Sequence, residues 1–265
     1  MADTAYHDTY YRWEWFHRQQ WLAGFRQSEP FARWRAMLEA IGDPEGKRVL
    51  DATCGLGRKT LVMDECGLDV MGSDASAYAV ERARELALGE AREIDFFVST
   101  WRDLPHRTSE RFDAVFVDAF MDCIETYEDL VASFAGIGSA LTDGGVFVFG
   151  GPEPNEKMAD ILEFAWDCGE RFSIDWRLAA EGRDCTCVCV KDKGDNYIDH
   201  NYLYVVRQHE GVMRLETAPL RRWFRWERDS LDKAALSVGF SAIRTELFRG
   251  DRFGVEDFTR IIATK

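Results

Sequence analysis

The chain has 265 residues, of which 46% are hydrophobic, so it is long enough for one large globular domain and too apolar for a disordered protein. Asp and Glu number 47 against 33 Lys and Arg, a formal net charge of −14. A surface of this sign repels phosphate backbones and anionic lipids, so neither a nucleic-acid nor a membrane partner is expected. With no membrane-spanning run and no signal-peptide pattern, a cytoplasmic location is expected.

Aromatic residues make up 13% of the whole chain, and residues 1–40 are especially rich in them. Their periodicity is weak up to about residue 30, and helical spacing of apolar residues then predicts a helix over 31–41. We interpret residues 1–40 as an aromatic lid and helix. Two roles stay open for the aromatic rings, which either pack the core of this lid or line a pocket that selects a substrate.

Residues 41–171 alternate between strand-like and helix-like patterns. Strands are predicted at 48–51, 69–73, 94–98, 112–118 and 145–149, and helices at 57–66, from Ser76 onward and at 125–141. This alternation predicts a parallel sheet with helices on both faces, the core of an α/β protein.

The pattern changes after residue 171. Strand-like runs at 172–178, 186–190, 197–206 and 212–226 predict an antiparallel insertion over 172–228. Within it Cys185, Cys187 and Cys189 alternate, which predicts one buried strand face rather than a metal cluster. Residues 229–265 return to the core, with a helix at 230–238 and strands at 242–248 and 258–264.

A glycine turn follows the first predicted strand, with Asp51, Gly55 and Gly57 in the spacing Asp-x-x-x-Gly-x-Gly. Glycines at a strand-to-helix turn let a ligand approach the backbone closely. Dinucleotide-binding proteins need a third glycine, but Thr60 stands in that position. S-adenosylmethionine requires no phosphate site, and Asp51 at the strand end could face its cationic part.

Two later positions extend this prediction. Asp74 ends the second strand, where a carboxylate can accept hydrogen bonds from both hydroxyls of a ribose. Trp101 follows the third strand and can cover an adenine ring. The ordered set predicts a cofactor that contains adenosine, with S-adenosylmethionine favoured over a nicotinamide dinucleotide.

These motifs resemble those of class I S-adenosylmethionine-dependent methyltransferases, most of all the glycine N-methyltransferase group. The likeness rests on Leu-Asp-x-x-Cys-Gly-x-Gly from Leu50 to Gly57, the turn 73–76, Trp101 and the strand beginning at Phe112. It implies a Rossmann-like fold with a mostly parallel seven-stranded sheet, helices on both faces and an antiparallel insertion subdomain. It also implies an N-terminal segment that covers the active site.

The resemblance assigns roles to individual residues. The cofactor contacts are Asp51, Thr53, Cys54, Gly55, Gly57, Asp74, Ala75, Ser76, Thr100, Trp101 and Asp118, with Tyr6, Trp15 and Arg26 closing over the cofactor from the N-terminal segment. Arg26 would hold the cofactor carboxylate, and Tyr202 would lie beside the reacting methyl group.

Two departures from the glycine N-methyltransferase pattern concern the acceptor. Residues 119–121 read Ala-Phe-Met instead of Gly-Asn-Ser, and Pro154 lies near the position of an arginine that grips glycine in that family. Glycine itself is therefore not the expected substrate. The residues predicted to contact the acceptor are Tyr11, Tyr204, Arg222 and Trp226, with Arg222, Phe224 and Trp226 on one face of a strand.

Methyl transfer to an amine needs an aligned, unprotonated nucleophile. Four side chains are candidates to take its proton, namely Asp118, Glu153, Asp199 and His200, and the predicted catalytic residues are Tyr202, His200 and Asp118. The expected function is N-methylation of a small amine, with a small-molecule acceptor as the partner and self-association left open. The alternatives are an O- or C-methyltransferase of a secondary metabolite, a non-catalytic protein that binds S-adenosylmethionine, and a nicotinamide oxidoreductase.

Overall fold

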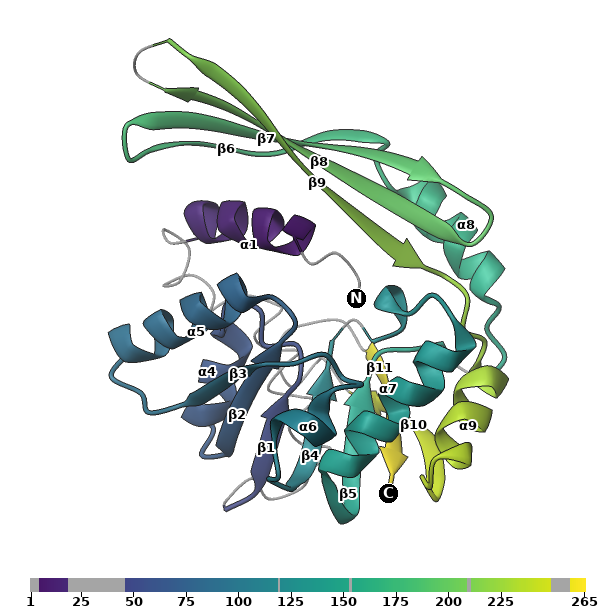
Figure 1. The fold of residues 1–265 in the computed structure, drawn as a ribbon. Coiled ribbons are helices and arrows are strands. Elements are labelled where there is room, and N and C mark those ends of the chain that lie inside the picture. The colour runs from purple at the N-terminus through teal and green to yellow at the C-terminus, as the bar shows by residue number, and fades with distance from the viewer. Residues whose placement is uncertain (1–4, 19–45, 119, 153, 209–210, 249–257) are drawn as a thin grey trace.

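The structure is a computed structural model that describes residues 5–18, 46–118, 120–152, 154–208, 211–248 and 258–265. These residues form a seven-stranded sheet and a four-stranded sheet, and helix α1 (Ala5–Arg18) lies between the two (Figure 1). This arrangement confirms the predicted α/β fold with a separate antiparallel subdomain.

The seven-stranded sheet has the order β10-β11-β5-β4-β1-β2-β3. Its parallel strands are β1 (Arg48–Asp51), β2 (Asp69–Asp74), β3 (Asp95–Val98), β4 (Phe112–Val117) and β5 (Leu141–Phe149). Strand β11 (Phe258–Thr264) pairs antiparallel with β5 and with β10 (Ala242–Phe248). The strand order reverses between β1 and β4, and open parallel sheets bind ligands beyond the carboxyl ends of their strands at such a point.

Helices cover both faces of this sheet. They are α4 (Arg58–Glu65), α5 (Ala77–Gly89), α6 (Leu104–Arg107), α7 (Tyr127–Ala140) and α9 (Arg228–Ser237), with a short 3-10 helix η3 (Met121–Cys123) after β4. Helix α8 (Met158–Cys168) lies beside the four-stranded sheet (Figure 1). Leu104, Phe134 and Leu231 pack from α6, α7 and α9 into one core, and Met63 of α4 packs into a second core against other residues of the same sheet. The Ser76 hydroxyl accepts a hydrogen bond from the Ala79 N–H, which confirms the predicted N-cap of α5.

The four-stranded sheet consists of consecutive antiparallel strands and arches over α1. They are β6 (Phe172–Ala180), β7 (Arg183–Lys193), β8 (Tyr197–Gln208) and β9 (Met213–Trp223). Cys185, Cys187 and Cys189 are all buried on one strand face, as their alternation predicts, and Cys185 and Cys187 belong to the cluster that contains Trp13 of α1. None of the described helices is long and apolar enough to cross a membrane.

Three elements differ from the sequence prediction. Helix α1 occupies a segment whose periodicity looked weak, because it packs against both sheets and so carries apolar residues on two faces. Helix α8 was not predicted, and β9 ends at Trp223 rather than at 226. The predicted helix at 31–41 lies outside the described residues.

Candidate active site

The turn between β1 and α4 is held in place by its neighbours. The Cys54 N–H donates to the Ser73 carbonyl of the next strand at 3.0 Å. Gly55 and Gly57 have φ angles of +50° and +83°, a left-handed conformation that strains any other residue. A Cβ atom at Gly57 would lie 2.8 Å from the Ala83 Cβ, so the predicted glycine is needed both for the turn and for its packing on α5.

Asp51 lies beneath this turn and is 0% exposed. Its carboxylate accepts a hydrogen bond from the Thr60 hydroxyl at 2.8 Å and one from the Thr53 N–H at 3.3 Å. Burial raises the pKa of Asp51 to about 6, while the nearby Lys59 acts in the opposite direction. Asp51 thus fixes the turn from below, and its contact with the cofactor stays a prediction.

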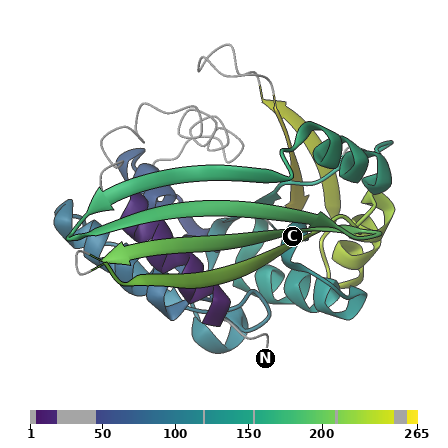
Figure 2. The ribbon, with the colours of Figure 1, turned by 90° about the horizontal axis from the view of Figure 1, so that it is seen from above.

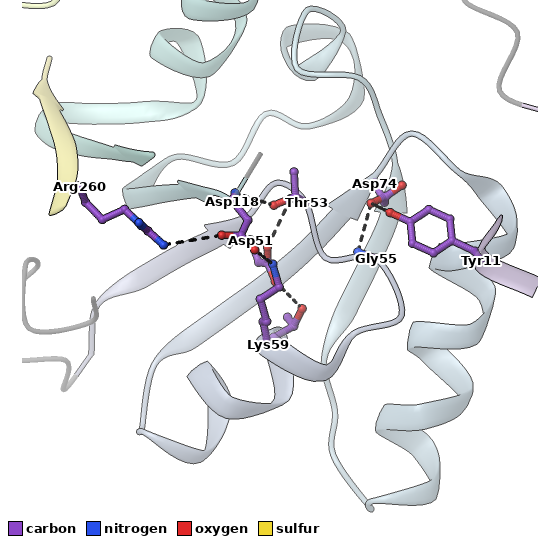
Figure 3. A network of polar contacts seen from close by, with 9 residues as sticks. Tyr11, Asp51, Thr53, Gly55, Lys59, Asp74, Asp118 and Arg260 are labelled. Atoms are coloured by element: carbon purple, nitrogen blue, oxygen red, sulfur yellow. Dashed lines mark hydrogen bonds and ion pairs between the residues drawn. The ribbon is translucent and has the colours of Figure 1, made fainter. Parts of the chain in front are cut away.

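Asp74, at the end of β2, faces the same turn from the side (Figure 3). One of its carboxylate oxygens accepts the Gly55 N–H at 3.1 Å and the Tyr11 hydroxyl at 3.2 Å, and the other accepts the Ser76 N–H at 2.9 Å. Burial raises the pKa of Asp74, and these donors oppose the shift. Its position beside the glycine turn fits the predicted ribose acceptor.

Helix α1 is fastened to the turn region by one face. Besides the Tyr11 contact, the Ser76 hydroxyl donates to Asp8. Trp15, one helical turn beyond Tyr11, packs against the apolar cluster of α4 and α5, with the Arg82 guanidinium 5.8 Å from its ring centre. The structure thus places Trp15 along α5 rather than over the turn. The Tyr6 side chain and Arg26 lie outside the described part of the chain, so their roles stay predictions.

A mixed cluster of charges lies where β1 and β4 end and β11 begins (Figure 3). The Lys59 ammonium is 2.6 Å from the Asp118 carboxylate, and the Arg260 guanidinium is 4.0 Å from it. The Asp118 N–H donates to the Thr53 hydroxyl at 3.1 Å. Burial opposes the ionisation of Asp118, but the attraction of Lys59 outweighs it and lowers the pKa. Asp118 is therefore an ionised binding group and a poor proton acceptor.

The remaining predicted cofactor residues surround the turn. Cys54 is buried, Ala75 is half-buried, and the Thr100 hydroxyl donates to Asp103 at 2.8 Å. The Trp101 indole N–H donates to the Ala52 carbonyl at 2.8 Å and its ring packs 5.1 Å from that of Phe120. These bonds fix the Trp101 ring near the end of β1, and its contact with an adenine stays a prediction.

A chain of aromatic rings connects the turn to the four-stranded sheet. Tyr11, bonded to Asp74, lies 5.6 Å from the ring of Tyr10, which lies 5.4 Å from that of Tyr202 on β8. The next ring on the same strand face is His200, 6.3 Å from Tyr202. Burial lowers the pKa of His200 to about 4, with Lys191 and Arg222 adding to the shift, so its imidazole is neutral at pH 7.

Two of the predicted acceptor residues are not placed to contact a substrate. Tyr204 is only 1% exposed, because it stacks on Trp13 of α1 at 5.3 Å. Trp226 lies past the end of β9, where its indole N–H donates to the Ile124 carbonyl and its ring joins the main core. The strand pattern was extended three residues too far, so Arg222 and Trp226 do not share a strand face. Arg222 bonds to Asp122 of η3 at 2.9 Å and links β9 to the region after β4.

Three residues of this site were missed by sequence reasoning. Lys59 follows Gly57 by two residues and so begins α4 beside the turn, a position that could have indicated it. Arg260 and Tyr10 had no such signal, because their places depend on the pairing of β11 with β5 and on the docking of α1.

Comparisons with known proteins agree with this geometry. Residues 49–145 match the family described as a methyltransferase domain. A solved structure of an amino pentose methyltransferase from Micromonospora echinaspora, which contains bound S-adenosylmethionine, superimposes with a TM-score of 0.61 and 19% identity over 91% of this chain and 94% of that one. The chain therefore has the Rossmann-like methyltransferase fold, and the methyltransferase-domain match lies within its seven-stranded sheet and helices.

The curated relatives include both N- and O-methyltransferases, so they do not indicate which atom is methylated. The glycine/sarcosine N-methyltransferase of Aphanothece halophytica is 28% identical over 108 residues, which are 37% of this chain and 41% of that protein. A ubiquinone biosynthesis O-methyltransferase of Alkalilimnicola ehrlichii is 29% identical over 121 residues, 46% of this chain and 48% of the relative. The matches thus span about half or less of each relative's length. The expected likeness to glycine N-methyltransferases is weak and partial.

The residues present fit S-adenosylmethionine, which supplies an activated methyl group when bound. Asp74 offers carboxylate oxygens for ribose hydroxyls, and the Tyr11 ring covers Gly55, 3.4 Å from where a Cβ would lie, so a ligand reaches this part of the turn when Tyr11 moves aside. Lys59 and Arg260 provide positive charge for a carboxylate, and Asp118 provides negative charge for an ammonium group. A zwitterionic amino-acid group therefore suits this cluster.

Proposed function

We propose that the chain is a methyltransferase that uses S-adenosylmethionine to methylate an amine nitrogen of a small molecule. The observation that carries the proposal is the line of rings from Asp74 to His200, which joins the cofactor turn to the inner face of the four-stranded sheet. The fold likeness to an amino pentose methyltransferase supports an amine acceptor. All seven cysteines lie in described parts of the chain and none forms a disulfide, which supports a reducing, cytoplasmic location.

Among the predicted proton acceptors, His200 is the one that lies on this line of rings, and its role is to orient the amine, because an imidazole with a pKa of about 4 is a weak base. Asp118 is held ionised by Lys59, and Asp199 is bound by two bonds from the Arg221 guanidinium at 2.6 and 2.7 Å. Glu153 lies outside the described residues. A neutral imidazole beside aromatic rings can accept a hydrogen bond from an amine N–H and align its lone pair, and the ring faces also favour a cationic acceptor nitrogen.

A panel of amines, phenols and thiols incubated with labelled cofactor tests the proposal. Transfer to amines is expected, and transfer confined to oxygen or sulfur acceptors would reject the nitrogen assignment. His200→Gln is expected to lower kcat at least tenfold while the affinity for S-adenosylhomocysteine, the cofactor product, stays unchanged. Equal kcat values for the variant and the wild type would remove His200 from the reaction.

The second candidate function is O-methylation, which the partial matches to ubiquinone biosynthesis O-methyltransferases favour. The same acceptor panel distinguishes it, because a phenol acceptor would then be labelled instead of an amine. A non-catalytic binding protein would bind S-adenosylhomocysteine in calorimetry and label none of the acceptors.

A further inference from the structure

The outer face of the four-stranded sheet, which points away from α1, carries large apolar side chains in contact with water. Phe172 and Ile174 of β6 are 64% and 46% exposed, and Met213 and Leu215 of β9 are 65% and 61% exposed. Figure 2 looks onto this face, and none of the described helices or strands lies over it. Single exposed apolar residues are common, but a continuous patch of them marks an interaction surface.

The strand register shows that these residues form continuous rows. Ile174 pairs with Val188, which pairs with Leu203, and Val205 pairs with Leu215. The cysteines of β7 alternate with these positions and point to α1, so Val188 and its partners face outward. The outer face therefore carries a band of apolar residues with Thr186, Asn201 and Thr217 beside it, whereas the solvated face of an antiparallel sheet is ordinarily polar.

We propose that this outer face, defined by Phe172, Ile174, Val188, Val190, Leu203, Val205, Met213 and Leu215, is the contact surface of a symmetric dimer of the chain. Four strands about 4.8 Å apart and about 30 Å long offer roughly 600 Å² per copy, so two stacked faces bury roughly 1,200 Å², where specific interfaces begin. Two sheets stack this way in β-sandwiches, at about 10 Å.

The charges at the two ends of the face suit a second copy. Arg207 bonds to Asp184 at one end and Arg221 bonds to Asp199 at the other, so these pairs are neutral. Arg177 is a further cation at the first end and Asp192 a further anion at the second, and neither forms an ion pair within the described ranges. A twofold axis across the strands places the Arg177 end of one copy over the Asp192 end of the other.

Sedimentation velocity of the wild-type chain and of two variants tests the dimer. The wild type is expected at twice the 30.4 kDa of one chain at 10 μM, and Leu215→Glu is expected to be a monomer. The matched control is Leu88→Glu, which changes another exposed leucine, 79% exposed on α5, and should remain a dimer. Circular dichroism and S-adenosylhomocysteine affinity confirm that each variant is folded. A monomeric wild type, or a Leu215→Glu dimer, would overturn the proposal.

Charge reversal tests the orientation independently. Arg177→Asp is expected to weaken the dimer about tenfold, and adding Asp192→Arg is expected to restore it, since opposite charges then face each other again. A double variant weaker than the single one would reject the antiparallel stacking of the two copies.

Discussion

At the scale of single residues, the lone pairs of Asp74 limit how the ribose can bind. Its two oxygens offer about four acceptor positions, and the protein already uses three, for Gly55, Ser76 and Tyr11. Two ribose hydroxyls need two positions, so one protein donor must leave. The Tyr11 hydroxyl is the donor that can withdraw most easily, because the other two are backbone groups of the turn and of α5.

This count predicts that Tyr11→Phe binds S-adenosylhomocysteine a few-fold more tightly than the wild type, because one competing donor is removed while the ring remains. Isothermal titration measures the affinity. Tyr127→Phe is the matched control, since it removes the hydroxyl of an exposed tyrosine at the start of α7, where the ring packs beside Trp226. Weaker binding by Tyr11→Phe would mean that the hydroxyl helps to hold the ribose.

Asp74→Ala is expected to weaken cofactor binding by roughly 30-fold or more, since each hydrogen bond to a charged acceptor contributes about 1.5–3 kcal/mol. The same titration measures this loss. Asp160→Ala, which removes an exposed carboxylate from α8, serves as the comparison and should change affinity little. Unchanged affinity in Asp74→Ala would place the ribose elsewhere.

The raised pKa of Asp51 should make the stability of the fold depend on pH. Its pKa in the folded chain is about 6 and its ordinary value 3.8, so the folded state retains a proton that the unfolded state has lost between these values. The stability contributed by Asp51 is present below pH 4 and is lost as pH rises through 6. Asp51→Asn removes this titration, so relative to the wild type it should gain up to about 3 kcal/mol between pH 4 and pH 8. Urea unfolding at both pH values measures the difference, and an equal gap at both would contradict it.

At the scale of elements, α1 connects the two sheets. Trp13 is 3% exposed, stacks on Tyr204 and donates its indole N–H to Glu216 of β9 at 2.9 Å, while Tyr11 and Trp15 face the other sheet. Trp13→Ala is expected to cost about 3–5 kcal/mol of α1 docking. Hydrogen exchange of the α1 amides measures this, and Phe164→Ala on the exposed face of α8 is the control. Unchanged α1 protection would show that Trp13 does not hold the helix.

Sequence patterns predicted some of these elements and missed others, α1 among them. Strand β4 was predicted because nearly all its side chains are buried, and the turn at Gly55 and Gly57 because only glycine accepts its backbone. Helix α1 and its contacts were missed, since a helix with two buried faces has no single apolar stripe. The pairings of Lys59 with Asp118 and of Tyr10 with Tyr202 join distant segments, so no local pattern could indicate them.

At the scale of the whole molecule, the candidate site belongs to both sheets, because the turn lies on one, His200 on the other, and α1 between them. S-adenosylhomocysteine at 100 times its Kd stabilises the folded state by about 2.7 kcal/mol, which for a chain of this size raises Tm by about 5 °C. If α1 couples the sheets, calorimetry should show one transition that shifts as a unit. In Trp13→Ala the coupling is weakened, so two transitions are expected, of which only that of the seven-stranded sheet rises with ligand. A single shifted transition in this variant would mean that the sheets are coupled by other contacts, such as Arg222 with Asp122.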